Sequence, residues 1–148
     1  MVFKDMTKDD IRELSQLYVK AFNSPPWNDK WSEEDVIIRL SQMIENKGFY
    51  GIKCYKNNKL IGMILGQSEH YYDGTHFEIK EFCVDNSESG KGIGSLILDN
   101  FIDILKKKGI SKVFLLTSRA IKTEGFYKKN GFKSIEDMVM MSKELIIE

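Results

Sequence analysis

Apolar residues recur at helical spacing in three stretches of this chain, at residues 11–22, 36–44 and 93–105. Ser, Thr and acidic residues stand just before the first two stretches, as is typical of helix N-terminal caps. Apolar positions every three or four residues form one face of an amphipathic helix. We therefore predict a helix over each stretch and a fourth, short helix over residues 123–129.

Three apolar runs in the middle of the chain, at residues 49–55, 60–67 and 77–84, are typical of antiparallel strands joined by tight turns. The Asn57-Asn58 pair between the first two runs suits a hairpin turn. In a strictly alternating strand, successive side chains point to opposite faces of the sheet. One face of the third strand would then carry Phe77, Ile79, Glu81 and Cys83.

Shorter runs extend the predicted sheet. Residues 2–6 predict a first strand, and residues 112–116 predict a strand parallel to the 77–84 strand, because a helix joins the two. Residues 132–135 and 138–143 predict a last hairpin. The predicted fold is α+β, with a mixed, mostly antiparallel sheet of six to seven strands flanked by four helices.

Composition and charge narrow the class of protein. Of the 148 residues, 42% are hydrophobic and 30% are charged, which indicates one soluble globular domain over residues 1–148. The 22 basic residues balance the 22 acidic residues, so we expect no nucleic-acid partner and no membrane partner. No apolar stretch approaches the ~18–20 residues that cross a bilayer. Two cysteines and an N-terminus without an apolar signal core favour a cytoplasmic protein.

Glycines occupy every second position at Gly90, Gly92 and Gly94, where the third strand run gives way to the helix over residues 93–105. Backbone N–H groups can converge at such a helix N-terminus, where the helix dipole favours negative charge. The pattern indicates a cradle for a pyrophosphate. The alternative is a Gly-rich turn that only starts a helix. The dinucleotide-binding and P-loop patterns fit this glycine spacing less well.

The segment Ser89–Gly94 resembles the signature Gln/Arg-x-x-Gly-x-Gly/Ala of the GNAT acetyltransferase superfamily, with Ser89 in place of Gln or Arg. A second mark of that family, Phe-Tyr-x-x-x-Gly-Phe, falls on residues 126–132. The resemblance covers nearly the whole chain and implies the GNAT fold, whose sheet is splayed in the middle, with acetyl-CoA as cosubstrate. The family's Asn-x-x-Ala pattern is missing, because Ala120 and Thr123 stand at those positions.

The resemblance also implies which residues contact acetyl-CoA. The backbone of residues 82–84 would pair with the pantetheine arm, the Gly-rich segment would hold the pyrophosphate, and residues 117 and 118 could replace the missing Asn. The expected cofactor-binding residues are Phe82, Cys83, Val84, Ser89, Gly90, Lys91, Gly92, Ile93, Gly94, Ser95, Thr117 and Ser118.

Acyl transfer to an amine needs one group that takes a proton from the amine and one that gives a proton to the leaving thiolate. We expect Glu81 as the base and, by the family resemblance, Tyr127 as the acid. Glu81 could equally be a solvated strand residue, and Tyr127 a packed core residue. We interpret Cys83 as a core residue rather than a nucleophile. His70 and His76 show no metal-ligand spacing with cysteines or carboxylates, so we expect no metal.

Aromatic and acidic residues around Trp27, Trp31 and Tyr71, together with Glu81, could receive a cationic amine, or the tryptophans could fix their loop to the core. The implied function is N-acetylation of a primary amine of a small molecule by direct attack in a ternary complex. Two alternatives stay open: a protein N-terminus or lysine as the acceptor, and a non-catalytic sensor that binds acyl-CoA. A homodimer is expected from the family resemblance alone.

Overall fold

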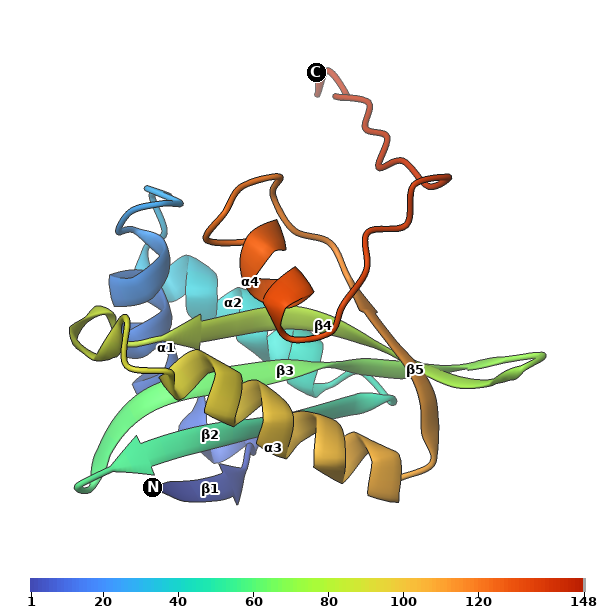
Figure 1. Cartoon of the computed structure of the whole chain (residues 1–148). Helices are drawn as coiled ribbons and strands as arrows, with labels where there is room; N and C mark the ends of the chain where they lie inside the picture. Colours follow the sequence, from blue (N-terminus) through green and yellow to red (C-terminus); the bar gives the residue numbers. More distant parts are fainter. Residues whose placement is uncertain (148) are drawn as a thin grey trace. The chain divides into compact units, whose positions relative to one another are not determined.

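The computed structural model describes residues 1–147, and its helices and strands follow the predicted order as far as residue 129 (Figure 1). The chain divides into two compact units, Met1–Leu116 and the residues from Thr117 onward. The single domain expected over residues 1–148 stays a prediction.

The first unit contains a five-stranded sheet with the strand order β1-β2-β3-β4-β5. Neighbouring strands are antiparallel except β4 and β5, which are parallel, as predicted. The elements of this unit are β1 (Val2–Asp5), the 3-10 helix η1 (Lys8–Asp10), α1 (Ile11–Phe22), α2 (Glu33–Ile44), β2 (Phe49–Lys56), β3 (Lys59–Tyr71), β4 (Gly74–Val84), the 3-10 helix η2 (Asn86–Glu88), α3 (Ile93–Lys107) and β5 (Ile110–Leu115).

Local sequence signals account for where several of these elements begin and end. The Ser32 hydroxyl accepts a hydrogen bond from the Asp35 N–H (3.1 Å) and so caps α2. The β2–β3 turn holds Asn57 and Asn58 at φ values of 50° and 62°, in the left-handed region that Asn tolerates. The predicted hairpin is therefore confirmed, although β3 and β4 extend further than their apolar runs.

Helices cover both faces of the sheet, with α3 in front and α1 and α2 behind it in Figure 1. On the α1 and α2 face, the core contains Leu14 of α1 and Leu65 of β3. On the other face, the fully buried ring of Phe101 in α3 lies 5.5 Å from that of Phe77 and 5.7 Å from that of Tyr50. The sheet is thus the middle of three layers in this unit.

A β-bulge in β4 decides which of its residues face which helices. Two consecutive residues of β3 pair with Ile79 and Glu81, so Lys80 is the extra residue. Phe77 packs against α3, whereas Glu81 contacts α1 and α2, and Cys83 belongs to the core on that same side. The strict alternation predicted for this strand, which put Phe77 and Glu81 on one face, was therefore wrong.

The sheet opens between β4 and β5. The parallel ladder involves Thr75 to Ile79 of β4, whereas the antiparallel ladder with β3 continues to Val84. This arrangement agrees with the splayed sheet that the family resemblance implied.

The second unit contains the short helix α4 (Glu124–Lys129). Residues 132–147 form neither a helix nor a strand, so the predicted hairpin of residues 132–135 and 138–143 is not formed, and the sheet has five strands rather than six or seven. Apolar content predicted this hairpin, but a strand also needs a partner for its backbone groups, which apolar content does not specify. The exposed apolar side chains of the segment include Met138, Val139, Met140, Met141, Leu145, Ile146 and Ile147.

We expect Phe101→Ala to lower the free energy of unfolding by about 3–5 kcal/mol, because it removes a buried ring that touches two others. Leu96→Ala is the matched control on the same helix, since Leu96 is 46% exposed, and it should cost less than about 1 kcal/mol. Urea denaturation measures both values. Equal losses for the two variants would show that α3 is not held by this aromatic contact.

Candidate active site

A buried carboxylate joins the sheet to two helices. Glu81 of β4 is 7% exposed, and its Oε1 atom accepts hydrogen bonds from the Tyr18 hydroxyl of α1 (3.0 Å) and from Nε of Arg39 in α2 (2.6 Å). The Arg39 contact is also an ion pair. Glu81 is therefore not the solvated strand residue of the alternative interpretation.

Trp31 supports this cluster from the loop between α1 and α2. The Arg39 guanidinium lies 5.6 Å from the centroid of the Trp31 ring, and the Tyr18 ring meets that ring edge-on at 5.4 Å. Asn23 fixes the Trp31 backbone with two hydrogen bonds, of 2.8 and 2.9 Å. Side chains from α1, the α1–α2 loop, α2 and β4 thus hold one another in place, namely Tyr18, Trp31, Arg39 and Glu81.

The charges of the cluster follow from burial and pairing. Burial raises the pKa of Glu81, while Arg39 and Tyr18 limit the rise by stabilising the ionised carboxylate. Burial and the Glu81 charge raise the pKa of Tyr18, so its hydroxyl remains a donor. A carboxylate whose pKa is raised is a stronger proton acceptor than an ordinary glutamate.

Cys83 lies two residues beyond Glu81 and is buried in the α1 and α2 core. Burial and the nearby charges of Glu81 and Asp85 raise the pKa of its thiol, which therefore stays protonated near neutral pH. These features agree with the interpretation of Cys83 as a core residue.

The Gly-rich loop is open and leads into α3. Gly90 and Gly92 have φ values of 77° and 75°, and no atom lies within 4 Å of where a Cβ would stand on either. Glycine is therefore required by the backbone conformation and not by crowding. The first N–H to reach back into α3 is that of Leu96, which bonds the Gly92 carbonyl, so the N–H groups of Ile93, Gly94 and Ser95 point out of the helix end.

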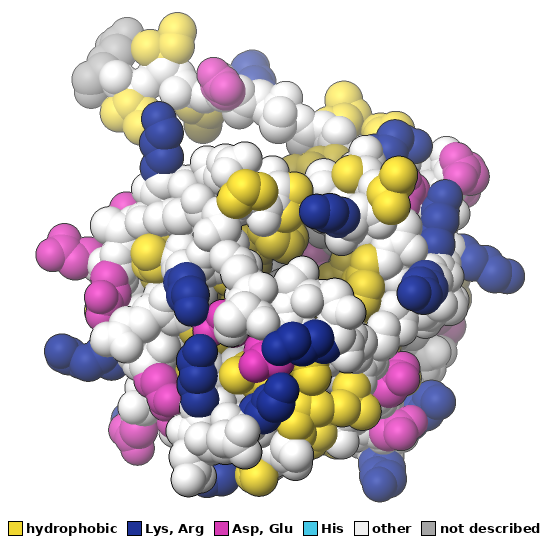
Figure 2. Space-filling model, turned by 60° about the vertical axis from the view of Figure 1, so that its left-hand side comes forward, with side chains coloured by type: hydrophobic (Ala, Val, Ile, Leu, Met, Phe, Trp, Pro, Cys, Tyr) yellow, Lys and Arg dark blue, Asp and Glu magenta, His cyan; other side chains and the backbone are white. Residues whose placement is uncertain are grey.

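Lysines from four segments gather beside this loop, and sequence reasoning missed three of them. Lys20 and Lys59 pair with Asp85, and Lys56 and Lys91 pair with Glu88. With four cations and two carboxylates, the cluster keeps a surplus of positive charge. Figure 2 turns this end of the sheet forward and shows dark blue side chains around magenta ones.

Asp85 organises the start of the loop. The Ser87 N–H and hydroxyl donate to its Oδ1 at 2.9 and 2.8 Å, and its own N–H donates to the Ile61 carbonyl at 2.7 Å. Although burial acts in the opposite direction, the Ser87 bonds and the Lys20 ion pair hold the pKa of Asp85 well below its usual range. The carboxylate is therefore ionised at neutral pH and fixes the turn that leaves β4.

The other predicted substrate residues are spread over the first unit. Trp27 is 41% exposed and packs edge-on against Phe22 at 5.1 Å, and it lies in the same α1–α2 loop as Trp31. Tyr71 stacks on His76 at 4.2 Å near the end of the β3–β4 hairpin, about 20 Å along the strand from Glu81 at ~3.3 Å per residue. The structure therefore brings Trp31, but not Tyr71, to Glu81.

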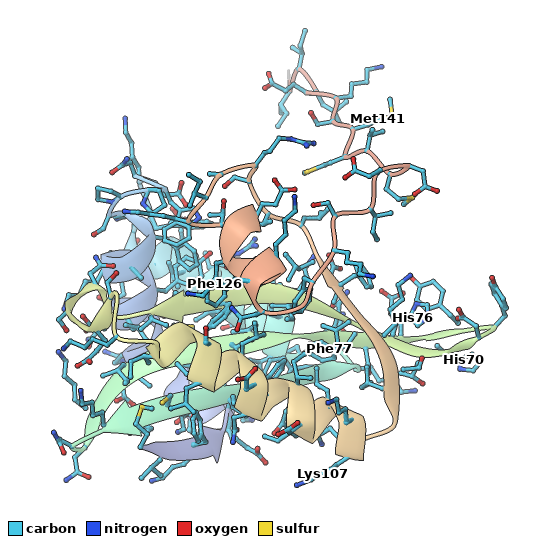
Figure 3. All side chains as sticks on the ribbon, viewed as in Figure 1. His70, His76, Phe77, Lys107, Phe126 and Met141 are labelled. Atoms are coloured by element: carbon cyan, nitrogen blue, oxygen red, sulfur yellow. The ribbon has the colours of Figure 1, made fainter. Side chains whose placement is uncertain are left out.

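Figure 3 shows the two histidines on the outer part of the same hairpin, beyond Phe77. Within residues 1–147, no group of three or more His, Cys, Asp or Glu side chains could hold a metal ion. In the same part of the chain, no helix has the length and apolar character needed to span a bilayer.

The remaining predicted site residues belong to the second unit. Tyr127 lies in α4, with ring contacts to Phe126 at 5.1 Å and Phe132 at 5.5 Å. The Ser118 hydroxyl donates to Oγ1 of Thr123 (2.8 Å), which in turn donates to the Ser118 carbonyl (2.7 Å). Thr123, where the family pattern differs, is thus buried and fixes the turn before α4.

Comparison with known proteins decides the family. The model of the acetyltransferase (GNAT) family matches residues 11–132, which is most of the chain. The chain belongs to this family. The GNAT resemblance inferred from the glycine and Phe-Tyr motifs is therefore confirmed.

Two curated relatives support this assignment. An uncharacterised N-acetyltransferase of Chlorobaculum tepidum is 36% identical over 109 residues, covering 72% of this chain and 64% of the relative. One of Methanocaldococcus jannaschii is 27% identical over 150 aligned positions, covering 90% of this chain and 61% of the relative. The chain thus spans less than two thirds of the length of these relatives.

A solved structure shows the same fold. An aminoglycoside acetyltransferase from an uncultured soil metagenomic sample, crystallised in complex with sisomicin, aligns with a TM-score of 0.73 at 16% identity. The alignment covers 98% of this chain and 96% of that chain. At this identity the likeness establishes the GNAT fold and nothing more specific.

Proposed function

We propose that this GNAT protein transfers the acetyl group of acetyl-CoA to a primary amine of a small molecule, by direct attack in a ternary complex. GNAT family acetyltransferases generally use acetyl-CoA, which supplies the acetyl thioester. The observation that carries the proposal is the open Gly90–Ser95 turn at the start of α3. This turn follows β4, the strand that carries the buried Glu81 carboxylate.

The residues of the first unit fit acetyl-CoA in two respects. The N–H groups of Ile93, Gly94 and Ser95 could donate hydrogen bonds to a pyrophosphate. The lysines that pair with Asp85 and Glu88 could neutralise further phosphate charge. The backbone of Phe82, Cys83 and Val84 lies where the ladder with β5 has ended, and it would align the pantetheine arm as an added strand. Thr117 and Ser118 stay candidates for a further contact.

Glu81 is the proposed base. It would accept a proton from the attacking amine, and its raised pKa suits that transfer. Tyr127 is the proposed acid, and its Oη atom would give a proton to the departing sulfur. Neither step requires a cysteine nucleophile or a metal.

The acceptor is proposed to be a small cationic amine. The chain shares its fold with an aminoglycoside acetyltransferase, and Trp27 and Trp31 offer aromatic surface near the Glu81 cluster. Tyr71 would contribute only to an acceptor that extends along the β3–β4 hairpin. A protein N-terminus or lysine and a non-catalytic acyl-CoA sensor are the alternatives, and acetyl-CoA turnover with an amine panel separates them.

A homodimer belongs to the proposal as well. The exposed apolar side chains of residues 138–147 are a surface that a second copy could cover.

We expect Gly92→Ala to weaken acetyl-CoA binding by at least about tenfold, because a side chain would occupy the space that the pyrophosphate needs. Gly109→Ala is the matched control. Gly109 also has a positive φ (83°) and open space for a Cβ, but it follows the other end of α3. Isothermal titration calorimetry measures both affinities, and an equal loss in the two variants would remove the loop from the binding site.

Glu81→Gln should lower kcat/KM by about a hundredfold or more, since it removes the base. In the parent protein, kcat/KM should fall as the pH drops through the raised pKa of Glu81, and the variant should lose this acidic limb. Glu78→Gln on the same strand, where Glu78 pairs with Lys80, is the control and should keep the parent profile. An acidic limb that persists in Glu81→Gln would contradict the assignment of the base.

Tyr127→Phe should reduce kcat by about a hundredfold while the Kd for acetyl-CoA stays nearly constant, because only the proton donor is lost. Tyr72→Phe, at a side chain that is 99% exposed, controls for loss of a hydroxyl. Equal losses of kcat and affinity in Tyr127→Phe would show that Tyr127 is a packing residue. Stopped-flow turnover and calorimetry supply the two numbers.

A further inference from the structure

The Glu81 carboxylate is held by one of its two oxygens. Both of its hydrogen bonds, from Tyr18 and from Arg39, end on Oε1, and within residues 1–147 no group bonds Oε2. The fully buried side-chain oxygen that lacks a partner in this part of the chain belongs to Asn100. Oε2 of Glu81 therefore keeps contact with solvent while Oε1 is fixed.

We infer that Arg39 is a positioning residue for Glu81, which holds Oε1 so that Oε2 is presented to the acceptor amine. The inference rests on the proposed function, in which Glu81 is the base. It adds that the base works while still paired with Arg39, because the acceptor uses the other oxygen. An acceptor therefore does not have to displace the guanidinium.

Arg39 is itself held in place, as this role demands. Its Nε donates to Glu81 at 2.6 Å, and its guanidinium lies 5.6 Å from the Trp31 ring centroid. The Trp31 indole N–H donates to Asp29 at 3.1 Å. The Asn23 side chain accepts from the Trp31 backbone N–H and donates to the Trp31 carbonyl. A flexible ammonium has neither the planar fork nor the stacking surface that this arrangement uses.

The charges around Glu81 single out Arg39 as the group that keeps the carboxylate ionised. Tyr18 from α1 donates a hydrogen bond but is neutral, and Lys80 on β4 contributes a weaker attraction. Cys83 is neutral, and Asp85 is negative and paired with its own lysines. Within residues 1–147 no other cation bonds the carboxylate, so loss of the Arg39 charge should make Glu81 harder to ionise.

The test measures Glu81 directly and then the reaction. Protein with ¹³C-labelled glutamate carboxyls is titrated by NMR, with the Glu81 signal assigned by its loss in Glu81→Gln. In Arg39→Gln we expect the titration midpoint of Glu81 to rise by about one to three pH units, and the acidic limb of kcat/KM to move with it. Arg12→Gln is the control, since Arg12 lies on the exposed side of α1 and forms no ion pair within residues 1–147.

Arg39→Lys keeps the positive charge but removes the planar guanidinium, so it separates the effect of charge from that of orienting Glu81. It also provides a test of the inference if Arg39→Gln does not fold. It should leave the titration midpoint of Glu81 near the parent value but lower kcat by about tenfold. The reason is that an ammonium group cannot stack on Trp31 and fix Oε1 of Glu81 at the same time. A folded Arg39→Gln protein whose Glu81 midpoint does not move overturns the inference. So does an Arg39→Lys enzyme with parent kcat.

Failure of the proposed function gives a different result. If the parent protein acetylates no amine, or if Glu81→Gln keeps full activity, the assignment of Glu81 as base fails regardless of Arg39. The NMR titration still reports whether Arg39 controls the protonation of Glu81, because it needs no turnover. A midpoint that shifts without any change in the acidic limb of kcat/KM overturns the positioning role.

Discussion

The extra residue at Lys80 in β4 is the constraint on which the proposed site depends. Before the bulge, Phe77 points toward α3, and after it Glu81 and Cys83 point toward α1 and α2. The bulge therefore delivers one carboxylate to the helices that carry Tyr18 and Arg39. Without it, strict alternation would place Glu81 on the α3 side of the sheet together with Phe77, away from Tyr18 and Arg39.

The same strand links this cluster to the Gly-rich turn. Beyond Val84, Asp85 bonds both the Ile61 backbone and the Ser87 turn, so the chain leaves β4 in a fixed direction and reaches Gly92 at the head of α3. The lysines on Asp85 and Glu88 come from α1, the β2–β3 hairpin and the loop itself. The proposed anion site and the proposed base thus lie on consecutive parts of one strand and its exit turn.

Much of the fold could be predicted from the sequence because periodicity and caps are local signals. The stripe in α3, the Ser32 cap and the Asn57-Asn58 turn each depend on a few neighbouring residues. The bulge at Lys80 could not be predicted, since it depends on pairing with β3 and leaves no mark in the apolar pattern. The final hairpin failed for a similar reason, because apolar residues do not specify a partner strand.

The residues of the candidate site likewise divide into those that the sequence could identify and those that it could not. The glycines and the Phe-Tyr motif could be found because the backbone conformation and the family pattern require particular residue types. Arg39, Lys20 and Lys59 could not be found, since their roles arise only when α1, α2 and the β2–β3 hairpin meet β4. A buried ion pair such as Arg39–Glu81 adds little to stability compared with an apolar cluster of the same volume. A carboxylate that is kept ionised there, with one oxygen fixed and the other accessible, is therefore better explained by chemistry at Oε2 than by folding.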